Sequence, residues 1–90
     1  MKEMNLPIDV VCKFVSGEKE PEPVRFRLTK ADGSRTTVNI DQIKQIEHVT
    51  PGSNHSIMYR CVTDQDGRQV IYDIRFWVNS MKWELHRIVL

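Results

Sequence analysis

Asp73 and His86 are the residue types that a hydrolase uses as an acid–base pair. The strand register that the turns predict sets Asp73 opposite both Arg60 and His86, and no serine or cysteine falls beside His86 as a nucleophile. The same register sets Arg75 opposite Glu84. These residues therefore predict a cross-strand charge ladder on an outer sheet face. A hydrolase built on Asp73 and His86 is less favoured than the interaction module or the nucleic-acid-binding barrel described below.

Histidine and cysteine spacing does not predict a metal site. His48 and His55 are separated by a Pro-Gly turn, and adding Cys12, Cys61 or His86 produces no recognised ligand pattern. The four glycines are each isolated in turns, so the chain lacks a glycine-rich phosphate loop. We therefore expect neither a metal nor a cofactor.

The composition predicts one small domain over residues 1–90 of a 10.6 kDa chain. Thirteen basic and twelve acidic residues leave a net charge of +1, so any attraction to nucleic acid must come from a local patch. No apolar run exceeds three residues, and the N-terminus lacks a hydrophobic signal core. With two well-separated cysteines, these features predict a cytoplasmic protein with no membrane contact.

Side-chain types favour an all-β fold. Ten valines and eight isoleucines outnumber four leucines and one alanine, and β-branched side chains prefer strands. Alternation of apolar and polar residues predicts strands at Ile8–Val15, Val24–Thr29, Ser56–Thr63, Gln69–Trp77 and Trp83–Leu90, with another around Val38 and Ile40. We expect a six-stranded antiparallel meander that closes into a small barrel or twists strongly.

Turn residues fix the expected register. Asp66-Gly67 fits a two-residue type I′ turn, and Ala31-Asp32-Gly33 fits a three-residue loop with Gly33 left-handed. With Asn79-Ser80 as the last loop, the predicted core pairs are Thr63–Val70, Cys61–Tyr72, Tyr59–Ile74, Ile57–Phe76, Phe76–Trp83, Ile74–Leu85, Val70–Val89, Phe26–Val38 and Val24–Ile40. Residues 41–50 have apolar side chains at every third position, which favours a bulged, bent strand over a short helical turn.

Two outer surfaces are candidates for binding. Val62, Ile71, Ile88 and Leu90 gather at one end, where the chain itself or another subunit must cover them. Arg35 and four other arginines on strands are predicted to point outward. The other four arginines, together with Trp77 as an aromatic side chain on which a base could stack, form a candidate nucleic-acid face. Its residues are Arg25, Arg27, Arg60, Arg75 and Trp77. Glu18, Glu20 and Glu22 in the Pro-rich loop dilute its charge.

The later part of the chain resembles short uncharacterised bacterial proteins that form domains of unknown function. The resemblance covers residues 24–90 and is carried by Phe26-Arg27-Leu28, a Gly turn, Val38, Ile40, Tyr59, Tyr72-Asp73-Ile74-Arg75-Phe76 and Trp83-Glu84-Leu85-His86-Arg87. Their shared ending is aromatic-x-aliphatic-x-aromatic, a turn and Trp-x-Leu. The resemblance implies a bacterial protein with a compact β-sheet fold, and it supplies no catalytic residue.

These observations favour a non-enzymatic interaction module. It would meet a protein partner or its own copy through a sheet edge or the patch formed by Val62, Ile71, Ile88 and Leu90. A nucleic-acid-binding barrel is the alternative.

Overall fold

The computed structural model describes residues 3–50 and 52–89, and they form an all-β structure. Within these residues there are seven strands: β1 (Leu6–Lys13), β2 (Glu22–Thr29), β3 (Arg35–Asn39), β4 (Gln42–Val49), β5 (Ser56–Gln65), β6 (Arg68–Trp77) and β7 (Lys82–Val89). The prediction of a bulged strand within residues 41–50 is confirmed, because β4 has a register shift between Ile43 and Gln45. The described residues form seven strands where six were predicted, because β3 and β4 are separate strands.

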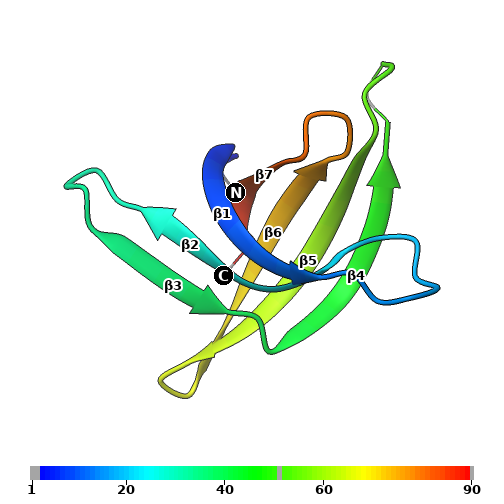
Figure 1. Ribbon diagram of the computed structural model, residues 1–90. Helices are drawn as coiled ribbons and strands as arrows, with labels where there is room; N and C mark the ends of the chain where they lie inside the picture. The colour runs from blue at the N-terminus through cyan, green and yellow to red at the C-terminus, as the bar shows by residue number, and fades with distance from the viewer. Residues whose placement is uncertain (1–2, 51, 90) are drawn as a thin grey trace.

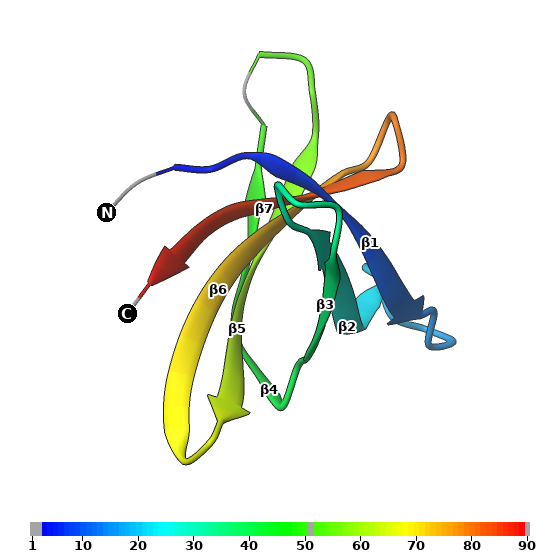
Figure 2. The ribbon, with the colours of Figure 1, turned by 90° about the vertical axis from the view of Figure 1, so that its left-hand side faces the viewer.

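All seven strands belong to one antiparallel sheet with the order β3-β2-β1-β7-β6-β5-β4. β1 pairs with β2 on one side and with β7 on the other, so the sheet curls into a half-barrel (Figures 1 and 2). Consecutive strands pair as in a meander, except that β3 and β4 form the two edges. The predicted barrel-like antiparallel fold is therefore confirmed, and the barrel is open rather than closed.

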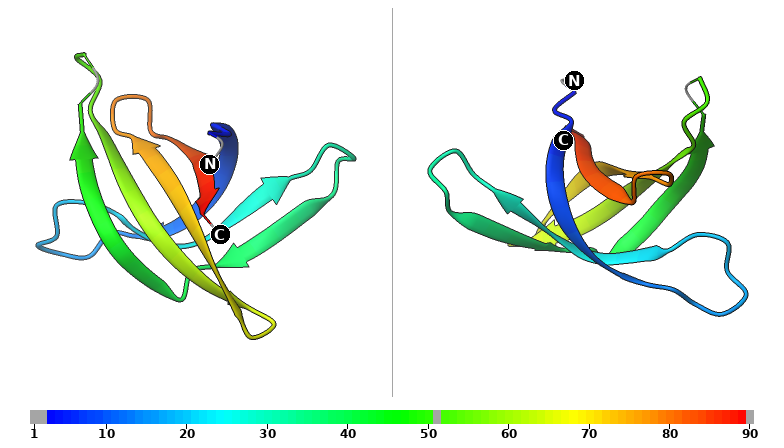
Figure 3. Two further views of the ribbon diagram at one scale, coloured as in Figure 1. Left: turned by 180° about the vertical axis from the view of Figure 1, so that it is seen from behind. Right: turned by 45° about the horizontal axis from the view of Figure 1, so that its top comes forward.

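The connection between β3 and β4 explains why the barrel stays open. Ile40 donates its backbone N–H to Val24 on β2, whereas Asp41 donates its own to Val62 on β5. Thr63 adds a side-chain hydrogen bond of 2.8 Å to the carbonyl of Asn39. Because adjacent residues bond to opposite sides of the half-barrel, β3 and β4 diverge from this point (Figure 3).

The core lies inside the curve and follows the predicted alternation. Tyr59, Ile74 and Leu85 are completely buried, and Phe26 meets Tyr72 edge to face with ring centroids 5.3 Å apart. The other buried apolar members of this cluster are Ile8, Val38, Ile57, Cys61, Val70 and Phe76. Removing these side chains from water provides the main drive for folding.

The predicted register is confirmed for the β5–β6 hairpin and for β2–β3. All four predicted β5–β6 pairs occur, and Phe26 lies opposite Val38. Asp66 and Gly67 have φ of 53° and 78°, as a type I′ turn requires, and Gly33 is left-handed with φ of 87°. Glycine at these turns avoids the steric cost of a side chain at positive φ.

A bulge in β7 overturns part of the predicted last hairpin. Phe76–Trp83 and Ile74–Leu85 are paired as predicted, but Asp73 then lies opposite Arg87. His86 is the extra residue, and it is buried beside Leu85. The predicted pairs Asp73–His86 and Val70–Val89 are wrong, because one inserted residue shifts everything beyond it.

Candidate functional site

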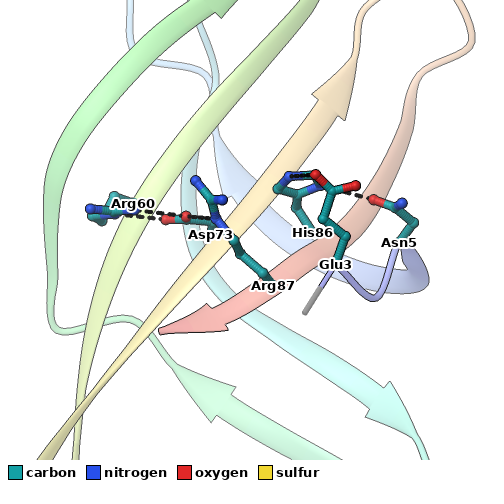
Figure 4. Close-up of polar contacts among 6 residues, drawn as sticks. All are labelled: Glu3, Asn5, Arg60, Asp73, His86 and Arg87. Carbon is teal, nitrogen blue, oxygen red and sulfur yellow. Dashed lines mark hydrogen bonds and ion pairs between the residues drawn. The ribbon is translucent and has the colours of Figure 1, made fainter. Parts of the chain in front are cut away.

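Asp73 is the centre of a buried ion cluster on β5, β6 and β7 (Figure 4). The residue is 1% exposed, and its carboxylate accepts two hydrogen bonds of 2.9 Å from Arg60 and one of 2.7 Å from Nε of Arg87. Burial pushes the pKa of Asp73 upward, but the hydrogen bonds and charges of the two guanidinium groups outweigh it and hold that pKa below its ordinary value. The carboxylate is therefore fully engaged.

His86 belongs to a separate cluster at the start of the chain (Figure 4). Its Nδ1 lies 2.8 Å from Oδ1 of Asn5, and its Nε2 lies 3.6 Å from a carboxylate oxygen of Glu3. The bulge that buries His86 also separates it from the partners of Asp73. The geometry thus gives neither residue the role that the acid–base hypothesis required.

The two cysteines carry protonated thiols. Burial raises the pKa of Cys61 to about 12, with a further contribution from the charge of Asp73, and burial also raises the pKa of Cys12. Because the thiolate is the nucleophilic form, both groups are weak nucleophiles at neutral pH. Nucleophilic catalysis by cysteine finds no support in these environments.

The predicted nucleic-acid residues are divided between two parts of the sheet. Arg25 and Arg27 lie on β2, whereas Arg60, Arg75 and Trp77 lie on β5 and β6, and β1 and β7 separate the two groups. Most are already engaged with neighbouring side chains. Arg27 contacts Asp9 at 3.1 Å, Arg60 binds Asp73, and Arg75 stacks 5.0 Å from the centre of the Trp77 ring.

The predicted aliphatic patch is mostly covered by the chain itself. Val62 is buried on β5, and Ile71 lies between Val62 and Val89 in the sheet. The β7 bulge turns Ile88 towards the core, against which it packs. Leu90 lies outside the described residues. The chain itself therefore covers Val62 and part of Ile88, whereas Ile71 stays partly exposed.

A groove beside β4 is the main feature that the sequence did not reveal. The loop between β1 and β2 crosses towards β4 (Figures 1 and 3). Residues of the loop and of β4 line a groove of about 500 Å³. The lining residues are Val15, Glu18, Glu20, Pro21, Glu22, Ile43, Lys44, Gln45 and Ile46. Tyr59 donates a hydrogen bond of 2.6 Å to the carbonyl of Pro21, which anchors this loop to the core. In the sequence, this Pro-rich loop stood out only for its three glutamates.

Two histidines meet at the far end of β4. Nδ1 of His48 lies 3.0 Å from Nε2 of His55, although their spacing in the sequence matched no known motif. Within residues 3–50 and 52–89, no group of three or more His, Cys, Asp and Glu side chains is arranged to hold a metal ion.

Comparison with known proteins adds no relative: no protein-family model, curated protein or solved structure matches the chain. The described residues contain no helix long and apolar enough to cross a membrane. By its fold, the described part of the chain is an open, seven-stranded antiparallel half-barrel.

Proposed function

We propose that this protein is a non-enzymatic interaction module that holds an extended segment of a partner protein against the open edge of β4. The groove between β4 and the loop after β1 is the observation that supports this proposal. The resemblance to small bacterial β-sheet proteins fits such a module, and we place it in the cytoplasm.

The edge of β4 offers backbone groups to a partner. β4 is hydrogen-bonded to β5, and among the described residues no strand pairs with its other side. Beyond the bulge at Lys44, residues 45–49 pair regularly with β5, so they form the straight part of this edge. A strand from another chain binds such an edge through main-chain hydrogen bonds.

Apolar side chains beside this edge provide anchoring contacts. Ile46 is 43% exposed and Val15 is 46% exposed, and both line the groove. Phe14, next to Val15, is 74% exposed. An exposed apolar cluster on a small protein is typical of an interaction site. In an extended partner segment, successive side chains point to opposite sides, so every second residue faces this surface and can be apolar.

The charge of the groove favours a basic partner. Glu18, Glu20 and Glu22 line it, against the single cation Lys44. Glu20 and Glu22 contact His48 and Lys13, so their carboxylates are already held in position. A partner segment that alternates apolar residues with lysine or arginine would match both the apolar and the acidic side chains.

A fluorescence polarisation assay with two labelled peptides tests the proposal. The first alternates lysine with valine over about ten residues, the length of a typical longer strand, and the second replaces lysine with glutamate. We expect the lysine peptide to bind, the glutamate peptide to fail, and backbone amides of residues 45–49 to exchange more slowly with deuterium in the complex. Binding of neither peptide would contradict the proposal.

Matched variants locate the binding surface. Ile46→Lys places a like charge at the groove and should weaken binding of the lysine peptide more than tenfold. Val11→Lys adds the same charge to an equally exposed position on β1 and should leave binding unchanged. Equal losses in both variants would overturn the assignment to β4.

The same sample tests the two remaining alternatives. A single-stranded oligonucleotide of mixed sequence, added at low salt, would shift the amide signals of Arg25, Arg27 and Trp77 if the nucleic-acid alternative is correct. Sedimentation that shows a dimer, abolished by Ile46→Lys, would replace the partner protein with a second copy of the chain.

A further inference from the structure

The β4–β5 hairpin points two imidazole nitrogens at each other. His48 lies on β4 opposite Ile57, and His55 directly precedes β5. Their rings are 5.1 Å apart between centroids and tilted by 56°, with Nδ1 of His48 3.0 Å from Nε2 of His55. A contact of this length requires a lone pair on one of the two nitrogens, because two N–H groups would repel.

Glu20 determines which nitrogen carries that lone pair. Its Oε2 lies 3.3 Å from Nε2 of His48, on the far side of the ring from His55. A carboxylate at Nε2 accepts the N–H there and leaves the lone pair of Nδ1 directed at His55. Metal-binding histidines characteristically have such a carboxylate behind them, which orients the ring and raises its basicity.

The backbone at His55 and Ser56 is fixed independently of the rings. The carbonyl of His55 accepts a hydrogen bond of 3.1 Å from the backbone N–H of Val78, in the turn after β6. The hydroxyl of Ser56 donates a bond of 2.9 Å to the carbonyl of Val49, which closes the base of the hairpin. The two rings are therefore held close before any ligand arrives, and such preorganisation favours binding.

The nitrogen separation suits a divalent transition metal. Metal–nitrogen bonds in proteins are about 2.0–2.1 Å, so two nitrogens 3.0 Å apart subtend roughly 90° at a shared ion. This angle is that of neighbouring positions in the square-planar or tetragonal geometry of Cu²⁺ and Ni²⁺.

We propose that His48 and His55 chelate a divalent transition-metal ion through Nδ1 and Nε2, respectively, with Glu20 as the residue that positions His48. In the free protein Nε2 of His55 carries the proton that it shares with Nδ1 of His48, and on metal binding this proton passes through solvent to Nδ1 of His55. The ion then exchanges two bound waters for the two imidazoles and keeps water in its other positions, because the described residues offer no third ligand there. Among common ions, Ni²⁺ and Cu²⁺ bind such nitrogen donors more tightly than Mn²⁺ or Fe²⁺.

Titration of the full chain with NiCl₂, followed by calorimetry and by amide signals, tests this site. Wild-type protein should bind one Ni²⁺ with shifts centred on residues 48 and 55, and His48→Gln or His55→Gln should lower the affinity more than tenfold. Glu20→Gln keeps both ligands and should still bind, about 10- to 100-fold more weakly. His86→Gln removes the third histidine of the chain, outside the site, and should leave the Ni²⁺ affinity unchanged.

The outcomes separate a built site from adventitious binding. Both ligand histidines are on the hairpin surface, so an unchanged amide spectrum away from residues 48 and 55 checks that the variants fold. Retained affinity in His55→Gln, or an equal loss in His86→Gln, would overturn the proposal. Full affinity in Glu20→Gln would remove the positioning role of Glu20. The His48→Gln and His55→Gln results are independent of peptide binding, because neither histidine lines the groove, whereas Glu20 belongs to both sites.

Discussion

The two sides of the half-barrel use carboxylates in different ways. On the closed side, formed by β5, β6 and β7, Asp73 is buried and neutralised by Arg60 and Arg87. On the open side, beside β4, Glu18, Glu20 and Glu22 line a groove whose lining includes one cation, Lys44, and Lys13 pairs with Glu22 from outside the lining. The contrast teaches that a paired, buried carboxylate holds the fold together, whereas a surplus of carboxylates beside a free edge favours binding another molecule.

The largest expected effect comes from breaking the charge cluster on the closed side. Asp73→Ala leaves two arginines without their partner and should lower the free energy of unfolding by about 3 kcal/mol, the lower end for a buried pair because both arginines remain partly in water. Urea denaturation measures this loss. Asp9→Ala, which removes the exposed partner of Arg27, is the control and should cost less than about 1 kcal/mol. Similar losses in both variants would show that burial of Asp73 is unimportant.

Acidic pH should produce the next largest effect. The pKa of Asp73 in the folded protein lies below its ordinary value, so the ionised cluster stabilises the fold above about pH 4, the pKa in the unfolded chain. This stabilisation is lost as pH falls through the folded pKa. Urea midpoints of wild type and Asp73→Asn, measured between about pH 6 and 2, should therefore converge towards low pH. A constant gap would contradict the assignment.

The smallest effect is expected on the open side. Glu18→Gln removes an exposed carboxylate from the groove and should change the free energy of unfolding by less than about 0.5 kcal/mol. The same variant should weaken binding of the lysine–valine peptide and reduce the salt dependence of that binding. Thermal unfolding and fluorescence polarisation measure the two quantities on one sample. A large loss of stability would place Glu18 among the structural carboxylates.

Local sequence was sufficient to predict much of the sheet. Asp66-Gly67 and Gly33 mark turns because few residues accept positive φ, and each turn fixes the pairing of the strands that it joins. Strand alternation then identified the core residues Phe26, Tyr59 and Ile74. These features depend on neighbours in the chain, so their physical causes are visible in the sequence.

Other features depend on contacts that local pattern does not encode. His86 follows a regular alternation in the sequence, yet in the structure it is the extra residue of a bulge and is buried next to Leu85. The groove requires the loop that carries Glu18 and Glu20 to cross to β4, and the meeting of His48 with His55 depends on the shape of one hairpin. Each of these sets was therefore missed or misassigned.

The pairing of β1 with β7 has a consequence for how the protein folds. Leu6 lies opposite Leu85, so this pairing joins the first strand to the last. The hairpins β2–β3 and β5–β6 need only short loops to close, whereas docking of β1 on β7 must overcome the entropy of a loop that spans most of the chain. During synthesis, β1 has only β2 as a pairing partner until β7 leaves the ribosome, so its other edge stays uncovered until then.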